Sequence, residues 1–451
     1  MARDFNRNTP SLSRSMVRHI LPGLAAAMLL AGCEGGAGSG MANPSSVGGR
    51  YILALGDADL PTEPGSSTML PTKPGLKDSL TVISLPIREP STPFAQADVS
   101  SSALGSPGQI AVSPDGRFAY VVETRGPALD VGARSVASLT MGDSLTSIDL
   151  TNLSAPKVLS KTYVGPDPRA VAVHPSGNYV AVVTTNARNQ LIVAPLGANG
   201  GVPGESIAWP LNGLDDDEAA PTAVAWHPSG RAIAVSLGNR AEVIFYRFKV
   251  TGESLELAPW GGPVKVGKQP IFGQFSKDGK HFVSLDAGSS RTQSDGQPLG
   301  PGRISVIRLD DNLDSEIAAG AHTVIASADT ALAPTGMAIS PDGTLIACAN
   351  GLVSVGSESR RGGSIVLYSL ARDGRLTTHG ESLLGAVPAG VTFDTTGRFL
   401  CVSQYASLDP EAYDGEVSFW RLVRKDGAPS LEQQDFFLGI GGGPHSAIII
   451  R

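Results

Sequence analysis

Short runs of apolar residues recur along the chain, and each is followed by a turn and a second run of β-forming residues. The segment Ala170–Val183, AVAVHPSGNYVAVV, returns as AVAWHPSGRAIAVS at Ala223–Ser236. Related copies begin at Ser106, Gln269, Ala333 and Val387. Each copy has a proline and, nine residues later, a glycine: Pro107/Gly116, Pro168/Gly177, Pro221/Gly230, Pro270/Gly279, Pro334/Gly343 and Pro388/Gly397. A regular internal repeat of this kind predicts a repeat architecture.

Each copy predicts a β-hairpin. Proline presets φ for the turn, and glycine takes the positive φ that closes it. A third apolar segment follows in each unit, for example SLTSIDL, QLIVAPL or EVIFYRF, and then a weaker fourth segment. Four antiparallel strands per unit, repeated around an axis, describe the blades of a β-propeller. The prolines are 49 to 64 residues apart, a variation that surface loops tolerate.

The two ends of the chain predict a seventh blade. Pro444 opens PHSAIIIR, a first strand with no partner after it, whereas Tyr51–Asp57 and Ser79–Leu85 match second and third strands without a first. Pairing these segments would remove two exposed sheet edges. We therefore predict an all-β, seven-bladed propeller over residues 50–451, closed by N-terminal outer strands that pair with the C-terminal inner strand.

Residues 1–32 are typical of a targeting segment. Arg14 and Arg18 precede an apolar run, ILPGLAAAMLLA, which is too short to span a bilayer. The run ends in LAGC at Cys33, which resembles a bacterial lipobox. That resemblance implies a lipid-anchored cell-envelope protein, located at the outer membrane and either periplasmic or surface-exposed. The alternative is a plain signal peptide with an incidental cysteine. Residues 33–49 are rich in Gly, Ser and Ala and predict a flexible tether.

Charge and composition narrow the possible partners. Removing residues 1–32, with four Arg and one Asp, lowers the formal net charge from −7 to −10. An acidic chain argues against nucleic acid as a partner. Cys348 and Cys401 are expected to be buried thiols in neighbouring blades. The sequence has no haem motif and no metal-spaced Cys/His set, so we expect no cofactor and no metal site. We expect a monomer.

Propeller geometry divides the loops between two faces. The turns between first and second strands share the turn face. The loops between second and third strands, and the links between blades, share the loop face. His174 and His227 flank equivalent turns, where other copies carry Ser113, Ser276, Ser340 and Asp394. They are either functional residues or supports for a repeated turn, and the repetition favours the second interpretation.

The loop face carries the long loops. We expect the residue after each proline to point toward the central channel or its rim, and Arg169 and His445 are the strong donors among them. The loops are long in blades four, five, six, seven and one, which are consecutive around the ring, and short in blades two and three. This arc of long loops suggests a binding surface for a protein, peptide or glycan. The run LDDDE (214–218) either binds a cation or is merely solvated. Candidate ligand contacts are Arg188, Asn239, Arg240, Asp286, Asn350 and Tyr405.

The stretch IAVSPDGRFAYVVETRG (Ile110–Gly126) resembles the YVTN/lactonase-type seven-bladed propellers. That resemblance implies either a surface or periplasmic binding protein or a lactone hydrolase similar to 6-phosphogluconolactonase. The lactonase branch tends to carry Pro-Arg-His at the start of an inner strand and a Glu after Tyr-Val-Val. Here Glu123 matches, but Arg169 is followed by Ala170, and His445 follows Pro444 without an Arg.

Two hypotheses follow. The first is a non-catalytic, lipid-anchored binding module that acts through its loop face. The second is a lactone hydrolase in which His445 is the base, Glu123 orients it and Arg169 stabilises the oxyanion. Convergence of these three side chains in a pocket would favour the enzyme, and burial or separation would favour the binding module.

Overall fold

The computed structural model describes residues 46–59, 68–69, 75–88, 94–104, 107–128, 134–187, 189–203, 206–211, 220–288, 300–355, 358–407 and 415–451. The chain divides into two compact units, 1–40 and 41–451, and all described residues belong to the second. None of the helices in this described part has the length and apolar character that a membrane crossing requires.

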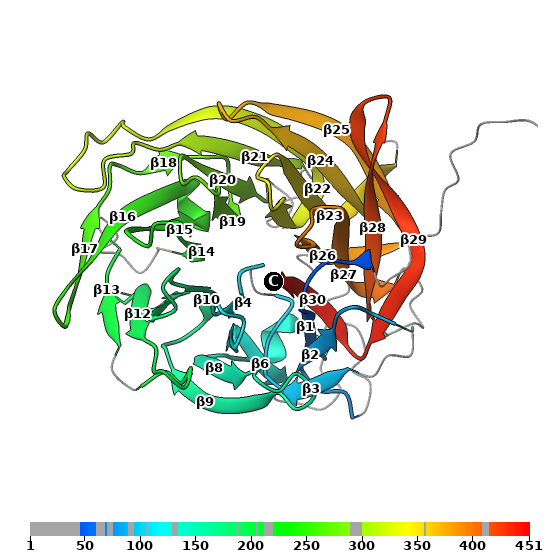
Figure 1. Ribbon diagram of the computed structural model, residues 1–451, viewed down its shortest axis with the longest axis horizontal. Helices are drawn as coiled ribbons and strands as arrows, with labels where there is room; N and C mark the ends of the chain where they lie inside the picture. The colour runs from blue at the N-terminus through cyan, green and yellow to red at the C-terminus, as the bar shows by residue number, and fades with distance from the viewer. Residues whose placement is uncertain are drawn as a thin grey trace, which may run out of the picture. The chain divides into compact units, whose positions relative to one another are not determined.

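Seven blades, built from six antiparallel sheets, are arranged around a central axis in the described residues, and the C-terminus lies at the centre of the ring (Figure 1). The first blade consists of β4 (Ile110–Val112), β5 (Phe118–Val122), β8 (Ser144–Asp149) and β9 (Lys157–Tyr163). The second consists of β10 (Pro168–Val173), β11 (Tyr179–Thr184), β12 (Leu191–Pro195) and β13 (Ile207–Trp209). The third consists of β14 (Pro221–Trp226), β15 (Ala232–Leu237), β16 (Glu242–Thr251) and β17 (Ser254–Pro259), with β18 (Val264–Lys265) beside β16.

The fourth and fifth blades share a strand. They consist of β19 (Pro270–Phe275), β20 (His281–Asp286), β21 (Pro301–Arg308) and β22 (Thr323–Ile339), and of the same β22 with β23 (Leu345–Val355), β24 (Glu358–Leu370) and β25 (Leu376–Leu384). β22 pairs with β21 and then with β23, and the change of partner occurs beside Ala333, whose φ is 50°. The sequence predicted two separate strands here, but a single bend in the backbone joins them.

The sixth and seventh blades complete the ring. They consist of β26 (Ala386–Phe393), β27 (Phe399–Ser407), β28 (Gly415–Lys425) and β29 (Ala428–Ile440), and of β30 (Gly443–Ile450), β1 (Tyr51–Asp57), β2 (Ser79–Ser84) and β3 (Ala95–Asp98). β1 pairs with β30, for example through Leu53 and Ile448. The predicted closure of the ring is therefore confirmed.

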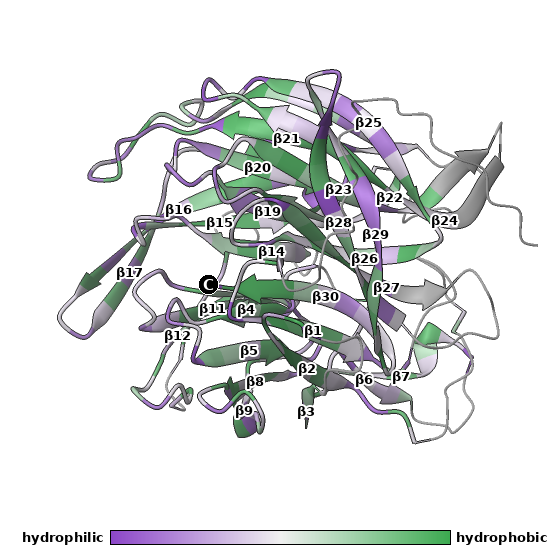
Figure 2. Cartoon of the chain, turned by 45° about the vertical axis from the view of Figure 1, so that its right-hand side comes forward, coloured by the Kyte–Doolittle hydropathy of each residue, from purple (hydrophilic) through white to green (hydrophobic). Residues whose placement is uncertain are grey.

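The hydrophobic core is divided among seven clusters, one between each pair of neighbouring blades. Successive side chains of a strand point to opposite faces, so a blade supplies both of its neighbours. On β1, Tyr51 and Leu53 pack toward the first blade, while Ile52 and Ala54 pack toward the sixth. Both faces of such strands must be apolar, which explains why the sequence shows continuous apolar runs there. Figure 2 shows hydrophobic colour on inner strands such as β30 and hydrophilic colour on the outer strand β25.

The repeated histidines join neighbouring blades on the turn face. Nδ1 of His174 accepts from the backbone N–H of Ser176 at 3.0 Å, so Nε2 carries the proton and donates to the carbonyl of Gly230 in the next blade at 2.8 Å. His227 makes the equivalent contacts with Ser229 and Gly279. Burial lowers the pKa of both imidazoles. The structural interpretation of these residues is confirmed.

Candidate ligand-binding channel

A β-bulge at the start of six inner strands changes where the predicted rim residues point. The pairing register shifts just after the proline, which leaves one extra residue on the inner strand. These extra residues are Arg169, Thr222, Ile271, Thr335, Ala389 and His445. Thr222 and Thr335 donate to the prolyl carbonyls of the next blade, Pro270 at 2.7 Å and Pro388 at 2.9 Å. None of these six residues lines the axial cavity, and the bulge turns Thr222 and Thr335 toward the neighbouring blade.

His445 lies in a buried polar seam between blades seven and one. It is 5% exposed, and its Nε2 lies 3.2 Å from Oγ of Ser101, which is 1% exposed. Burial lowers the pKa of His445 to about 3, so the imidazole is neutral at pH 7. A hydrolytic base must reach solvent or substrate. The Ser101–His445 pair reaches neither and instead connects two blades.

Two aspartates complete this seam. Asp78 accepts from the N–H of Ser101 at 3.1 Å and from that of Ala58 at 2.9 Å, and Asp57 accepts from the N–H of Ala103 at 2.6 Å. Burial raises the pKa of Asp78 to about 6. Burial, reinforced by the neighbouring Asp78, raises the pKa of Asp57 well above its usual range. Both aspartates hold the link between blades, and the sequence analysis missed them because isolated carboxylates in loops carry no recognisable pattern.

Glu123 and Arg169 each have other partners. The carboxylate of Glu123 accepts from Ser144 Oγ at 2.8 Å and pairs with Lys161 Nζ at 3.0 Å. Burial raises the pKa of Glu123, but hydrogen bonds from Lys161, Ser144 and Ser100 outweigh burial and lower it overall. Arg169 pairs with Asp167 at 2.5 Å.

The same Asp167 carboxylate also binds Arg125, at 2.7 Å. The described partners of His445, Glu123 and Arg169 are other residues, but neighbouring residues link the three. Ser100 donates to Glu123 while Ser101 contacts His445, and Thr124 Oγ1 donates to the Pro168 carbonyl at 2.7 Å. The three residues therefore lie in one region, in which His445 and Glu123 are buried.

The other predicted ligand contacts have varied positions. Asp286 is 2% exposed and accepts from the backbone N–H groups of Gln269 and Gly288, and burial raises its pKa. Asn350 is fully buried and donates to the Cys348 carbonyl at 3.2 Å. These two side chains support the fold, because each is enclosed by its own blade and the adjoining link and has no accessible face for a ligand.

Asn239 and Arg240 lie in a short helical turn, η3 (Gly238–Arg240), where Asn239 accepts from the N–H of Ala220. Tyr405 lies on β27. Arg188, Cys33 and the run 214–218 lie outside the described residues. Cys348 and Cys401 are buried free thiols, as expected.

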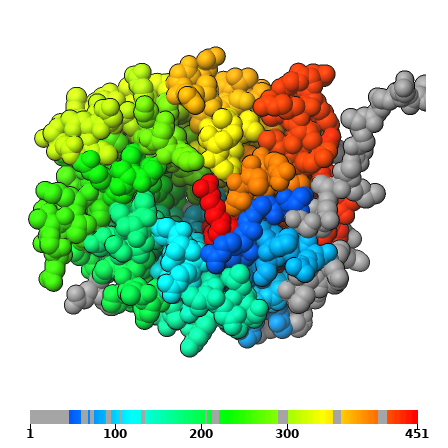
Figure 3. All heavy atoms as spheres, in the orientation of Figure 1, coloured from blue at the N-terminus to red at the C-terminus, as the bar shows by residue number. Residues whose placement is uncertain are grey.

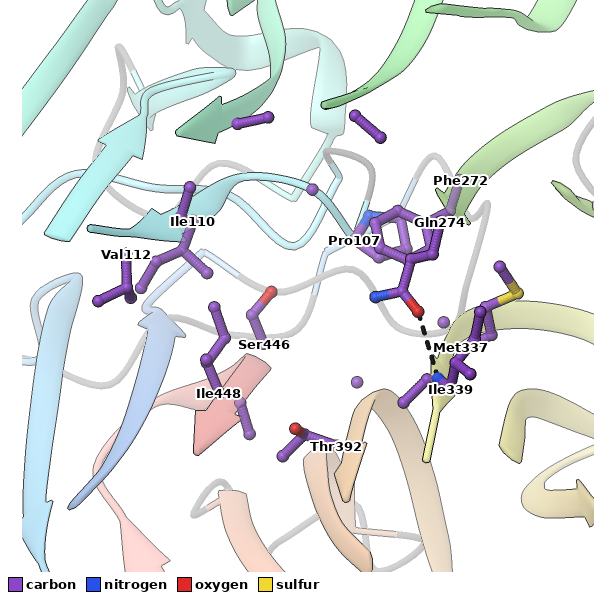
Figure 4. A pocket seen from close by; sticks show the side chains of 18 of the residues that line it. Pro107, Ile110, Val112, Phe272, Gln274, Met337, Ile339, Thr392, Ser446 and Ile448 are labelled. Carbon is purple, nitrogen blue, oxygen red and sulfur yellow. Dashed lines mark hydrogen bonds between the residues drawn. The ribbon is translucent and has the colours of Figure 1, made fainter. Parts of the chain in front are cut away.

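A cavity of about 530 Å³ runs along the propeller axis and is lined by all seven inner strands. Its lining includes Ile110, Val112, Phe272, Gln274, Met337, Ile339, Thr392, Ser446 and Ile448 (Figure 4). Most of the lining side chains are apolar, but polar atoms contribute nearly as much of the exposed cavity surface as apolar atoms do. The size matches that of ligand pockets in proteins.

The cavity opens toward the turn face. Pro341, Thr395 and Arg451 line both this cavity and a shallower depression formed by the turns, so the two are continuous. In the space-filling view, a hollow lies at the centre of the ring beside the C-terminal strand (Figure 3). At the other end of the cavity, Pro107 approaches Gly336 of the fifth blade, and Gly108 accepts from the N–H of Val171. The first blade therefore reaches across the axis and narrows that end.

Comparisons with known proteins identify the fold. No protein-family model matches the sequence, and no curated protein matches it. Among solved structures, a candidate 6-phosphogluconolactonase from Bacteroides fragilis superposes with a TM-score of 0.60 at 15% identity, over 89% of this chain and 98% of that one. The fold is that of the lactonase-like β-propellers.

Two further structures agree with this fold. A candidate 6-phosphogluconolactonase from Bacteroides uniformis gives a TM-score of 0.60 at 14% identity, over 89% of this chain and 99% of that one. The periplasmic gluconolactonase PpgL of Pseudomonas aeruginosa gives 0.56 at 15% identity, with the same coverage of both chains. Identities this low show the architecture alone, so function has to be argued from the residues of this chain.

Proposed function

We propose that this protein is a non-hydrolytic binding protein of the cell envelope that takes a small, largely apolar ligand into its central channel from the turn face. The observation that carries this proposal is the axial cavity of about 530 Å³, narrowed at one end and lined mostly by apolar side chains with polar atoms exposed between them. The targeting segment and Cys33 support an envelope location with a lipid tether.

The site of binding differs from the one expected from the sequence. Much of the loop arc lies outside the described residues, and the cavity described here reaches the opposite face.

Hydrolysis of a lactone is the rival function, because the names of the three structural neighbours give that activity. The contacts of His445, Glu123 and Arg169 argue against it here: two are buried, and the third pairs with Asp167. A lactonase needs a base and a cation that can both touch the substrate.

Binding of prodan, a neutral fluorescent naphthalene ketone, tests the proposal in the purified protein. Thr392→Phe and Ala172→Phe both place a ring in the channel and should abolish binding, whereas Thr377→Phe, on the exposed outer strand β25, should leave it unchanged. Equal binding by both channel variants and the wild type would refute the channel site.

A lactone assay completes the test. Release of acid from glucono-δ-lactone should not exceed the uncatalysed rate, either in the wild type or in His445→Ala. Turnover in the wild type that His445→Ala abolishes would instead establish the lactonase.

A further inference from the structure

One position of the repeat lines the channel in every blade. The fourth residue after each proline is alanine in four blades and differs in the other three, where it is Gln274, Thr392 and Ile448. The four alanines are Ala111, Ala172, Ala225 and Ala338, and all seven residues line the cavity. Since alanine satisfies the packing of four blades, the fold itself does not require a polar side chain at this position.

Gln274 directs hydrogen-bond donors into the channel. Its Oε1 accepts from the backbone N–H of Ile339, in the next blade, at 3.2 Å. That bond fixes which end of the amide is oxygen, because an N–H can donate only to the oxygen. The Nε2 group therefore points toward the lumen (Figure 4). An amide N–H in that position suits an oxygen acceptor.

One hydroxyl group adds a second donor to the lumen. Thr392 Oγ1 makes a long bond of 3.4 Å to the carbonyl of Phe393, and Thr392 lines the cavity. This hydroxyl can donate to a ligand. Ser446 also belongs to the lining, but its Oγ is buried beneath the cavity surface.

Away from its mouth, the channel offers a ligand no unpaired charged side chain among the described residues. Its described lining contains two ionisable side chains, Asp394 and Arg451. Asp394 accepts from the N–H groups of Gly48, Arg398 and Phe399 and from Thr396 Oγ1, and Arg451 stands at the mouth. Burying a charged ligand group without a partner is strongly unfavourable. The lumen therefore suits an uncharged molecule.

We propose that Gln274 and Thr392 determine the specificity of the channel and select an uncharged ligand that carries a carbonyl oxygen. This inference rests on the proposed binding function. It disfavours phosphorylated sugars deep in the channel, because the cationic side chain of the described lining, Arg451, stands at the mouth.

The test compares prodan binding to the wild type, Gln274→Met and Thr392→Val. Gln274→Met keeps the length of the side chain but removes its donors, so the Kd for prodan should rise roughly fivefold to tenfold. The emission of bound prodan should also shift to shorter wavelength, since its carbonyl loses a hydrogen bond. Thr392→Val keeps the shape of the side chain without its hydroxyl and should weaken binding by a smaller factor. Gln96→Met, on the exposed position of β3, is the matched control and should match the wild type.

An anionic dye of similar size, 1-anilinonaphthalene-8-sulfonate, tests the exclusion of charge. Binding of this dye in the channel is the binding that Thr392→Phe removes. The Kd of that binding should be at least tenfold higher than the Kd of prodan. An unchanged Kd and emission maximum in Gln274→Met would overturn the inference, as would equally tight channel binding of the anion. Both results leave the proposed function standing, whereas that function itself fails if the channel-filling variants still bind prodan.

Discussion

Leu53 of β1 lies directly opposite Ile448 of β30, so the seventh blade is assembled from two segments at opposite ends of the sequence. Both side chains belong to the cluster between blades seven and one. This contact closes the ring of seven interfaces. Because every blade packs on two neighbours, losing one interface exposes apolar surface on both sides of the gap.

Truncating these side chains tests the closure. Leu53→Ala should lower the free energy of unfolding by about 3 kcal/mol, because it leaves a cavity in a fully buried site. In a double-mutant cycle with Ile448→Ala, the coupling should exceed about 0.5 kcal/mol. Urea unfolding measures both. Leu383→Ala, at a position that is 69% exposed, is the control and should change stability by less than about 0.5 kcal/mol. Additive effects in the cycle would contradict the pairing.

The histidine on the turn face should matter for stability and not for binding. His174→Ser removes the bond to Gly230 and the edge-on contact with Trp226, whose ring centroid is 4.7 Å away. We expect a loss of about 1–2 kcal/mol in thermal unfolding experiments. Serine supports its own turn, as Ser113 does with Asp115 at 2.6 Å, but it is too short to reach the next blade. An unchanged melting temperature combined with lost prodan binding would show that His174 is instead a functional residue.

Acidification should weaken the seam through His445. Burial lowers the folded-state pKa to about 3, while an unfolded histidine has a pKa of about 6.5. The unfolded state therefore binds more protons between these values, and stability falls as the pH drops below about 6.5. By pH 4 this contribution amounts to about 3 kcal/mol. His445→Gln cannot titrate, so its unfolding free energy should fall less between pH 7 and pH 4. Parallel pH profiles of the two proteins would refute this prediction.

The buried aspartates should act in the opposite direction. The folded-state pKa of Asp78 is raised to about 6, so the folded state binds more protons than the unfolded state between about pH 4 and pH 6. Stability from this group is therefore lost as the pH rises through that range. When the pH is raised from 4 to 8, the free energy of unfolding of Asp78→Asn should increase by about 2–3 kcal/mol relative to that of the wild type. Asp98→Asn, at an exposed ion pair, is the control and should show no such gain. If the difference in unfolding free energy between variant and wild type is the same at pH 4 and pH 8, the folded protein does not disfavour the charged form of Asp78.

The number of blades and their strands could be predicted because their signals are local. A proline and a glycine nine residues apart fix each turn, and apolar runs on both sides of it supply two buried faces. The continuous strand β22 was not predictable in this way, since it depends on the unusual backbone angle of Ala333. Gln274 and Thr392 do stand out when the copies are aligned, because alanine occupies their position in four other blades. Alignment alone does not show which positions face the axis.

The sequence by itself determined a closed ring of repeated four-stranded sheets, since turn chemistry and alternation act over a few residues and recur in each copy. The direction of the side chains at the axis was decided only by the tertiary structure. At six of the inner strands the bulge inserts an extra residue that does not line the channel, and a contact such as His445 with Ser101 joins positions 344 residues apart. Such effects depend on how neighbouring blades pack together, and no local pattern encodes that packing.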